Sequence, residues 1–385
     1  MEYFRNGSRR AAALVLFAIV AVGATACPTS PPTVTPNPPS AVAAGQSHTC
    51  VVMQNGTVKC WGLNSGGALG NGTLLNSSVP VQVAGITSAS SVAAGNLHSC
   101  ALLNDGTVKC WGWNADGQLG DGTTTGASTP VQVSGISNAI AISAGYAHTC
   151  ALLAGGTATC WGFNTNGELG DGSTNASSVP VVVNGLSGAS TISAGAFHSC
   201  ATLTDGSGKC WGNNTYGQLG TEFNANSTVP VGVHALTDAN GITADGYHSC
   251  ATLTTGQIKC WGSNGYGELG DGTNLNSNLP VTVSGISTAV TVTGGFNHSC
   301  AILLGGAVSC WSENTAGQLG NGTNSASNVP VAVTALTGAT GIAAGYSHSC
   351  AIVASGVKCW GTNANGELGT GSNVGSNLAV SVVGL

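Results

Sequence analysis

The amino-acid sequence predicts an all-β protein, a seven-bladed β-propeller built from repeats of about 50 residues. Cysteines recur at a constant spacing through most of the 385 residues, the chain contains 60 glycines, and only 6% of its residues are charged. Amphipathic helices would need many more Lys, Glu and Arg on their solvent-exposed faces. Strands joined by glycine-containing turns account for this composition.

The first 26 residues are predicted to be an export signal peptide. Three arginines precede an apolar stretch, residues 11–23, that is too short to span a membrane as a helix. Small residues at 24–26 are typical of a cleavage site, and Cys27 follows directly. This arrangement resembles the lipobox of bacterial lipoproteins, in which the cysteine is lipidated after cleavage. An ordinary secretory cleavage at the same bond is the alternative. Residues 27–40 then form a proline-rich, extended linker.

Residues 41–385 hold the seven repeats, and each repeat predicts the strands of one blade. In the second repeat, residues 100–103 and 107–110 read as strands on either side of Asn-Asp-Gly, which predicts a hairpin with the glycine at positive φ. Residues 130–133 predict a further strand with a proline at its start. One such unit cannot bury both of its faces, so the units must stack on one another.

The two ends of the repeat region predict how the ring closes. The chain ends at residues 380–385, where the next repeat would begin, and residues 40–45 supply that missing piece. We expect the N- and C-terminal strands to pair within one blade, which would leave no open sheet edge.

Each repeat follows approximately the pattern A-G-x-x-H-[ST]-C-A-x-L-x-x-G-x-x-K-C-W-G-x-N-x-x-G-[QE]-L-G-[DN]-G-T and ends on V-P-V-x-V. This pattern resembles the regulator of chromosome condensation repeat, whose family members fold as seven-bladed propellers with four-stranded blades. The resemblance covers residues 41–385 and recurs in all seven repeats. The paired cysteines are a departure, because the nuclear members of that family do not link their blades in this way.

The two cysteines of each repeat are predicted to form a disulfide across the hairpin. Cys100 and Cys110 face each other in a hairpin centred on residue 105, at a Cα separation that a disulfide accepts. An exported chain meets an oxidising compartment, and pairing within repeats leaves one of the 15 cysteines over, Cys27. Reduced buried cysteines, or zinc held with the neighbouring histidine, are the alternatives. The predicted pairs are Cys50–Cys60, Cys100–Cys110, Cys150–Cys160, Cys200–Cys210, Cys250–Cys260, Cys300–Cys310 and Cys350–Cys359.

The other recurring residues are interpreted as structural. Each histidine is expected to bond a neighbouring turn, with a ring of metal ligands as the alternative. One position holds Gln, Glu or Ala, so it cannot supply a general acid, and we expect turn residues or solvated residues there. The following Asp alternates with Asn, which indicates a turn rather than a calcium site. The tryptophans alternate with a cysteine on the hairpin and should pack between blades. The histidines are His48, His98, His148, His198, His248, His298 and His348.

Candidate binding residues are the aromatic side chains at positions where the repeats differ. They stand beside the recurring histidine or in the loop after the Trp-Gly pair, and aromatic residues on loop faces are common contact anchors. Packing within half-buried loops is the alternative for each of them. The candidates are Trp113, Phe163, Tyr146, Phe197, Tyr216, Tyr247, Tyr266, Phe296 and Tyr346.

The charge balance limits the choice of partner. Without the first 26 residues, 13 acidic residues face five lysines and no arginine. Such a surface has neither bidentate clamps for phosphate nor the basic stripe that nucleic acid requires. We expect a monomer that binds a protein or a glycan at the cell surface, touches a membrane only through a lipid anchor, and needs no cofactor or metal.

The sequence thus predicts a binding scaffold, not an enzyme, that is either a cell-envelope lipoprotein of the outer membrane or surface or a secreted protein. The resemblance also allows an enzyme inhibitor, because a secreted bacterial propeller of this kind inhibits β-lactamases. Guanine-nucleotide exchange, the activity of nuclear family members, fits poorly with an export signal and seven disulfides. No Ser-His-Asp or paired-carboxylate pattern specific to one repeat indicates a hydrolase.

Overall fold

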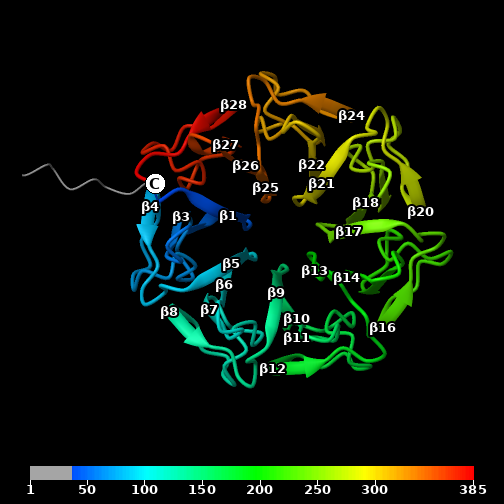
Figure 1. The fold of residues 1–385 in the computed structure, drawn as a ribbon, viewed down its shortest axis with the longest axis horizontal. Coiled ribbons are helices and arrows are strands. Elements are labelled where there is room, and N and C mark those ends of the chain that lie inside the picture. The colour runs from blue at the N-terminus through cyan, green and yellow to red at the C-terminus, as the bar shows by residue number, and fades with distance from the viewer. Residues whose placement is uncertain (1–36) are drawn as a thin grey trace, which may run out of the picture. The chain divides into compact units, whose positions relative to one another are not determined.

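The computed structural model describes residues 37–385, which form seven four-stranded antiparallel sheets arranged as blades around a central opening (Figure 1). Within each blade the strands follow chain order from an inner strand beside the opening to an outer strand at the circumference. Residues 37–385 contain no helix. The predicted fold class, an all-β seven-bladed propeller, is confirmed.

The strands have the following bounds. The first blade contains β1 (Pro39–Ala44), β2 (His48–Met53), β3 (Val58–Gly62) and β4 (Ser77–Gln82), and the second β5 (Ala89–Ala94), β6 (His98–Leu103), β7 (Val108–Gly112) and β8 (Ala127–Gln132). The third contains β9 (Ala139–Ala144), β10 (His148–Leu153), β11 (Ala158–Gly162) and β12 (Ser177–Val182), and the fourth β13 (Ser193–Ala194), β14 (His198–Thr202), β15 (Gly208–Gly212) and β16 (Ser227–Gly232). The fifth contains β17 (Ala239–Ala244), β18 (His248–Leu253), β19 (Ile258–Gly262) and β20 (Ser277–Thr282), and the sixth β21 (Ala289–Gly294), β22 (His298–Leu303), β23 (Val308–Ser312) and β24 (Ser327–Ala332). The seventh contains β25 (Gly341–Ala344), β26 (His348–Val353), β27 (Gly356–Gly361) and β28 (Ser376–Ser381).

The propeller begins slightly earlier than the sequence indicated. Strand β1 starts at Pro39, and the backbone N–H of Asn55 donates to Oδ1 of Asn37 at 2.9 Å. Residues 37–40, expected to be linker, are therefore part of the first blade. The predicted signal peptide, Cys27 and the rest of the linker lie outside the described residues.

The seven predicted disulfides are present, one across the β2–β3 hairpin or its equivalent in each blade. Cys100 pairs with Cys110 in the sheet register, as the hairpin pattern required, and the Cα–Cα separations of the seven bridges are 4.0–4.1 Å. Each bridge closes a loop of about ten residues, and the chain-entropy model assigns such a loop roughly 2 to 3 kcal/mol of stabilisation.

The recurring tryptophans pack between blades, as predicted. Trp111 is fully buried, and its Nε1–H donates to the carbonyl of Ala68 in the preceding blade at 2.8 Å. The indole lies against Gly70, whose φ is +64° and where a Cβ would come within 2.7 Å of Nε1. Glycine is therefore required there both by backbone conformation and by space. The same contact recurs at Trp61, Trp161, Trp211, Trp261, Trp311 and Trp360.

The ring does not close as the sequence predicted. Strands β1 and β28 lie in different sheets, because each blade is built from four consecutive strands. Closure uses the same packing as every other junction: Trp61 Nε1–H donates to the carbonyl of Glu367 at 2.7 Å, and Val51 and Met53 share a buried apolar cluster with Ile352. A regular repeat can be divided into blades at more than one point without changing its sequence pattern, and the strand pairing in the structure decides between the divisions.

Candidate functional site

The candidate binding residues all lie on one face of the ring. The second strand of each blade starts where the third strand ends, as the pairing of His48 with Gly62 illustrates. The turns that join first to second strands and the long loops that join third to fourth strands therefore share a face. All nine candidates belong to these turns and loops, and we call this side the aromatic face. The hairpin turns between second and third strands lie on the opposite side, the hairpin face.

Five of the candidates form a continuous row of rings, which we call the aromatic arc. Tyr146, Phe197, Tyr247, Phe296 and Tyr346 come from five consecutive blades, and successive ring centroids are 4.5–5.5 Å apart. The pairs are stacked, tilted or edge-to-face, within the range of favourable aromatic contacts. These rings are therefore packed on one another as well as placed at the surface.

Four candidates stand farther along the chain, in the long loops. The ring of Phe163 is edge-on to Phe197 at 6.3 Å, and that of Tyr216 is edge-on to Tyr247 at 5.4 Å. Trp113 is 48% exposed and Tyr266 is 51% exposed. Since the other seven of the eight tryptophans are 0% exposed, Trp113 alone presents an indole to solvent.

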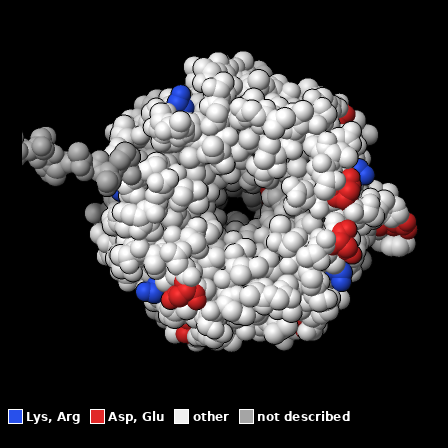
Figure 2. Space-filling model, in the orientation of Figure 1, with Lys and Arg blue, Asp and Glu red and all other residues white. Residues whose placement is uncertain are grey.

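The lysines lie away from the aromatic face. All five occupy one repeat position near the start of the third strand, which is its end toward the hairpin face. Lys59 and Lys209 donate from Nζ to the carbonyls of Gly384 and Gly185, in segments that follow outer strands on that face. In Figure 2 the charged side chains gather toward the circumference, and the surface around the central opening is almost uncharged.

The recurring histidines form a closed ring of hydrogen bonds through all seven blades. His98 Nε2 is 2.9 Å from Oγ1 of Thr149 in the next blade, and the equivalent contact is 2.8–2.9 Å at every junction. The Thr149 hydroxyl donates to the carbonyl of Gln118 at 3.0 Å. Because that hydroxyl has one proton, it must accept from the imidazole, and Nε2 carries the histidine proton.

Burial keeps these imidazoles neutral. Desolvation, aided at several positions by neighbouring histidines, lowers their pKa from 6.5 to about 3 or about 4. The ring of His48 lies against Gly45, where a Cβ would overlap with the imidazole. The histidines are therefore structural, as interpreted, but they bond a Ser or Thr hydroxyl on a strand of the next blade instead of a turn. In six of the seven repeats a glycine makes room for the imidazole.

The position that holds Gln, Glu or Ala is buried in all seven blades, so the expectation of solvated side chains there is wrong. Glu168 Oε2 accepts a hydrogen bond from the backbone N–H of Asn166 at 2.9 Å, and Gln118 Oε1 accepts one from Asp116 at 3.0 Å. Burial raises the pKa of Glu168 and of Glu268. These are turn residues, the other interpretation that the sequence allowed.

Polar contacts of the long loops were predicted only in part. Asp121 Oδ1 accepts from the backbone N–H of Thr123 at 2.9 Å, as expected of a turn former. Asn114, which recurs in every repeat, was missed: its Nδ2 donates to the carbonyls of Thr123 and Thr125, and its Oδ1 accepts from the Leu119 N–H. The recurrence of asparagine at this position in all seven repeats could have indicated its structural role.

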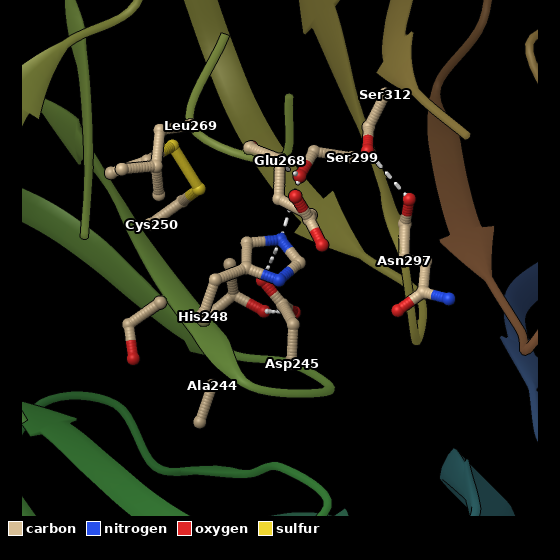
Figure 3. A network of polar contacts seen from close by, with 12 residues as sticks. Ala244, Asp245, His248, Cys250, Glu268, Leu269, Asn297, Ser299 and Ser312 are labelled. Carbon is tan, nitrogen blue, oxygen red and sulfur yellow. Dashed lines mark hydrogen bonds and ion pairs between the residues drawn. A yellow bond between two sulfur atoms is a disulfide. The ribbon is translucent and has the colours of Figure 1, made fainter. Parts of the chain in front are cut away.

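The junction between the fifth and sixth blades departs from the others (Figure 3). Asp245 stands where the other six repeats have glycine, and Gly294 of the next blade stands where they have alanine. A Cβ on Gly294 would overlap with the Asp245 carboxyl. Oδ1 of that carboxyl accepts from the Thr243 hydroxyl at 2.6 Å, and Oδ2 lies 3.5 Å from His248 Nε2. Burial raises the pKa of Asp245 to about 7.

Asp245, His248 and Ser299 together do not form a hydrolytic triad. The carboxyl and the Ser299 hydroxyl both lie beside Nε2 of His248, at 3.5 and 2.8 Å, whereas a triad engages one imidazole nitrogen with each partner. Ser299 is also fully buried. Cys250 completes a compact group with Asp245 and His248, but its sulfur is bonded to Cys260 and is not free to bind a metal as a thiolate.

Two family models of the regulator of chromosome condensation (RCC1) repeat match the chain. One covers residues 55–102, 105–152, 156–202, 210–252, 255–302 and 306–352, and the other residues 40–68, 89–118, 139–168, 189–218, 289–318 and 339–367. The chain belongs to the RCC1 repeat family. The resemblance inferred from the sequence is thereby confirmed, although no curated protein matches the chain.

Several solved structures share this fold. Human WBSCR16 is 21% identical, with 82% of this chain and 87% of that chain covered and a TM-score of 0.75. Prp20p from Saccharomyces cerevisiae is 25% identical, with 79% and 80% covered and a TM-score of 0.71. The ectodomain of the Arabidopsis thaliana receptor kinase ACR4 is 21% identical, with 84% and 98% covered and a TM-score of 0.51.

The disulfides bear on where this RCC1-repeat protein resides. Seven disulfides indicate an oxidising environment, because cytosolic thiols are kept reduced. Residues 37–385 include no helix of the length and apolarity needed to cross a membrane.

Proposed function

We propose that this chain is an exported binding protein that holds a partner protein on its aromatic face. The continuous row of rings in the aromatic arc, together with exposed Trp113 and Tyr266 on the same face, carries the proposal. The rings are held by one another and by a disulfide-linked scaffold, so little side-chain freedom remains to be lost when a partner binds. Aromatic residues in such a setting are the usual energetic centre of a protein interface.

The similar structures support a protein as the partner. The structural study of Prp20p reports its binding properties toward Gsp1p and histones. A second structure contains yeast Prp20 bound to Kap60. Those partners belong to the yeast protein. For this chain they support the use of an RCC1 propeller as a rigid platform for another protein, whereas a glycan is the alternative ligand on the same face.

The proposed location is the cell envelope. Residues 1–26 would direct export, Cys27 would carry the lipid, and the linker that follows would hold the propeller away from the membrane. The seven disulfides support this assignment, since each would be at risk of reduction in the cytosol. We propose a monomer that needs no cofactor and does not bind nucleic acid.

The test is capture of partners from an envelope extract with wild-type protein and matched variants. Trp113→Ala and Tyr266→Ala remove exposed rings from the aromatic face, and Leu304→Ala removes a side chain that is 77% exposed on the hairpin face. We expect the aromatic-face variants to weaken a specific partner at least about tenfold, and the Leu304 variant to bind as wild type. Equal loss with all three variants, or binding only to a glycan array, would overturn the proposal.

The second candidate function, enzyme inhibition, is a special case of the same binding. It predicts that titration of a β-lactamase or a protease with the propeller abolishes activity at one-to-one stoichiometry, and that Trp113→Ala reverses the effect. Saturable binding without loss of activity would leave the scaffold function alone.

A further inference from the structure

The aromatic arc surrounds one end of the central opening, where the structure contains a cavity of about 120 Å³. Tyr146, Phe296 and Tyr346 line this cavity, and Gln46 and Asn96 line it from the first two blades, which lack arc residues. An engineered protein cavity of about 150 Å³ holds one benzene molecule. The cavity is therefore large enough for one small head group.

The backbone around the cavity is not arranged to hold an anion. The N–H of Gln46 donates to the carbonyl of Gly95 at 3.1 Å, and equivalent bonds of 2.8–3.3 Å join each blade to the next around the whole ring. These seven N–H groups already donate to carbonyl oxygens and are not free to bind an anion. Among the described residues that line the cavity, the buried side-chain atoms without a hydrogen-bond partner are both acceptors, Oδ1 of Asn96 and Oδ2 of Asp245.

Asp245 brings the only carboxyl group among the residues that line the cavity. Its side chain is 1% exposed and lies beside Gly294, also a lining residue, and its nearest basic group is the neutral imidazole of His248 at 3.5 Å. The lysines project from the hairpin end of the third strands, so none is placed to compensate this carboxyl. Burial of an unpaired carboxyl raises its pKa, here to about 7, and a cation in the cavity would favour the ionised form.

We propose that this cavity binds an alkylammonium group, which the rings of Tyr146, Phe296 and Tyr346 attract by cation–π interaction and the Asp245 carboxylate attracts by charge. Aromatic rings beside a small cavity, with an acidic group buried behind its wall, suit a quaternary or primary ammonium head group. The excess of 13 acidic residues over five lysines beyond the signal peptide also favours the approach of a cation. The site goes beyond the protein-binding surface, because a free small molecule could fill it.

The probe is choline chloride, titrated into the full chain at pH 7.5 and followed by ligand-observed NMR and calorimetry. Its control is 3,3-dimethylbutan-1-ol, which has the same shape without the charge. We expect choline to bind at least about tenfold more tightly than the neutral alcohol, because only choline carries the positive charge that the rings and the Asp245 carboxylate attract. A peptide that contains trimethyllysine forms a second arm, and tighter binding of the peptide would identify a protein side chain as the source of the ammonium group.

Matched variants locate the site. Tyr346→Leu and Asp245→Asn should each weaken choline about fivefold or more, whereas Tyr266→Leu, on the same face but outside the cavity, should have no effect. Tyr146→Leu repeats the test at a second ring if one variant does not fold, as judged by circular dichroism. Equal affinity for choline and the neutral alcohol, no saturable binding by choline, or equal loss in the Tyr266 variant would overturn the proposal. The partner-capture experiment with Trp113 and Leu304 variants would be unaffected by that failure.

Discussion

Six of the seven blade junctions are built alike, and the junction between the fifth and sixth blades differs from them. In the six regular junctions, a glycine lies against the imidazole. In the seventh, Asp245 replaces that glycine, and Gly294 replaces the alanine found at the equivalent position of the other repeats. The hydroxyl of Ser299 is 3.4 Å from the carbonyl that it donates to, against 2.9–3.1 Å for its equivalents. The ring therefore accepts a buried carboxyl where the neighbouring blade supplies the space, with a longer hydrogen bond as the cost.

The largest expected effect comes from the histidines that all seven junctions share. Their folded-state pKa values are about 3 to 4, below the value of 6.5 in an unfolded chain, so below pH 6.5 only the unfolded state takes up protons. The histidine contribution to stability should be constant above pH 6.5 and fall as the pH is lowered toward those folded values. At pH 5.5 each histidine should cost about 1.4 kcal/mol, or roughly 10 kcal/mol in total. Guanidinium unfolding at pH 7.5 and 5.5 measures this, and an unchanged midpoint would contradict it.

Asp245 should change stability with pH in the opposite direction. Its folded-state pKa of about 7 is above the ordinary 3.8, so its contribution is fully present below pH 3.8 and is lost as the pH rises through 7. Asp245→Asn removes this titration, and relative to wild type it should gain roughly 2 to 3 kcal/mol between pH 5 and pH 8. Parallel pH profiles of the two proteins would show that the carboxyl is not buried as described.

Asp245 is larger than the glycine of the other repeats, and Gly294 is smaller than their alanine. A double-mutant cycle can test whether this exchange of side-chain size is compensatory. Gly294→Ala alone should destabilise the protein by about 1 to 3 kcal/mol, because the new methyl overlaps with the carboxyl. The same substitution in an Asp245→Gly background restores the pair found at the regular junctions and should be neutral or stabilising. Thermal unfolding of the four proteins gives the coupling energy, and additive effects would rule out the exchange.

The smallest expected effect compares two equivalent hydroxyl groups. Ser99→Ala removes a donor that lies 3.0 Å from the Ala68 carbonyl, and should cost about 1 kcal/mol or more because His48 loses its acceptor as well. Ser299→Ala removes the weaker 3.4 Å contact and should cost less. Denaturant midpoints of the two variants decide the order, and a larger loss at Ser299 would reverse the comparison.

Local features of the fold were predictable from the sequence, because they depend on residues close together in the chain. The hairpin register fixed Cys100 opposite Cys110, and alternation along the strand placed Trp111 on the other side. Ring closure was mispredicted, because residues 40–45 continue the repeat pattern equally well at either end. Asp245 broke the Ala-Gly pattern in the sequence, but only the contact with Gly294 of the next blade gave that break a physical meaning.

The site was predicted in the same partial way. Sequence differences between repeats identified the aromatic side chains and placed them in loops. Five of these aromatic rings contact one another in a continuous arc. This contact follows from the curvature of the propeller, which brings equivalent turns of neighbouring blades together. The sequence left open whether Glu168 is a turn residue or a solvated one. Its residue type is common at the surface, and its partner, the N–H of Asn166, is a backbone group that the sequence does not reveal.

Counting thiols in natively produced protein tests the central claim, a covalent link across every blade. The chain is unfolded, exposed to an alkylating reagent before and after reduction, and weighed intact by mass spectrometry. We predict that the 14 repeat cysteines take up no label before reduction and 14 labels afterwards. Full labelling without a reducing agent would contradict both the linked blades and the export inferred from them.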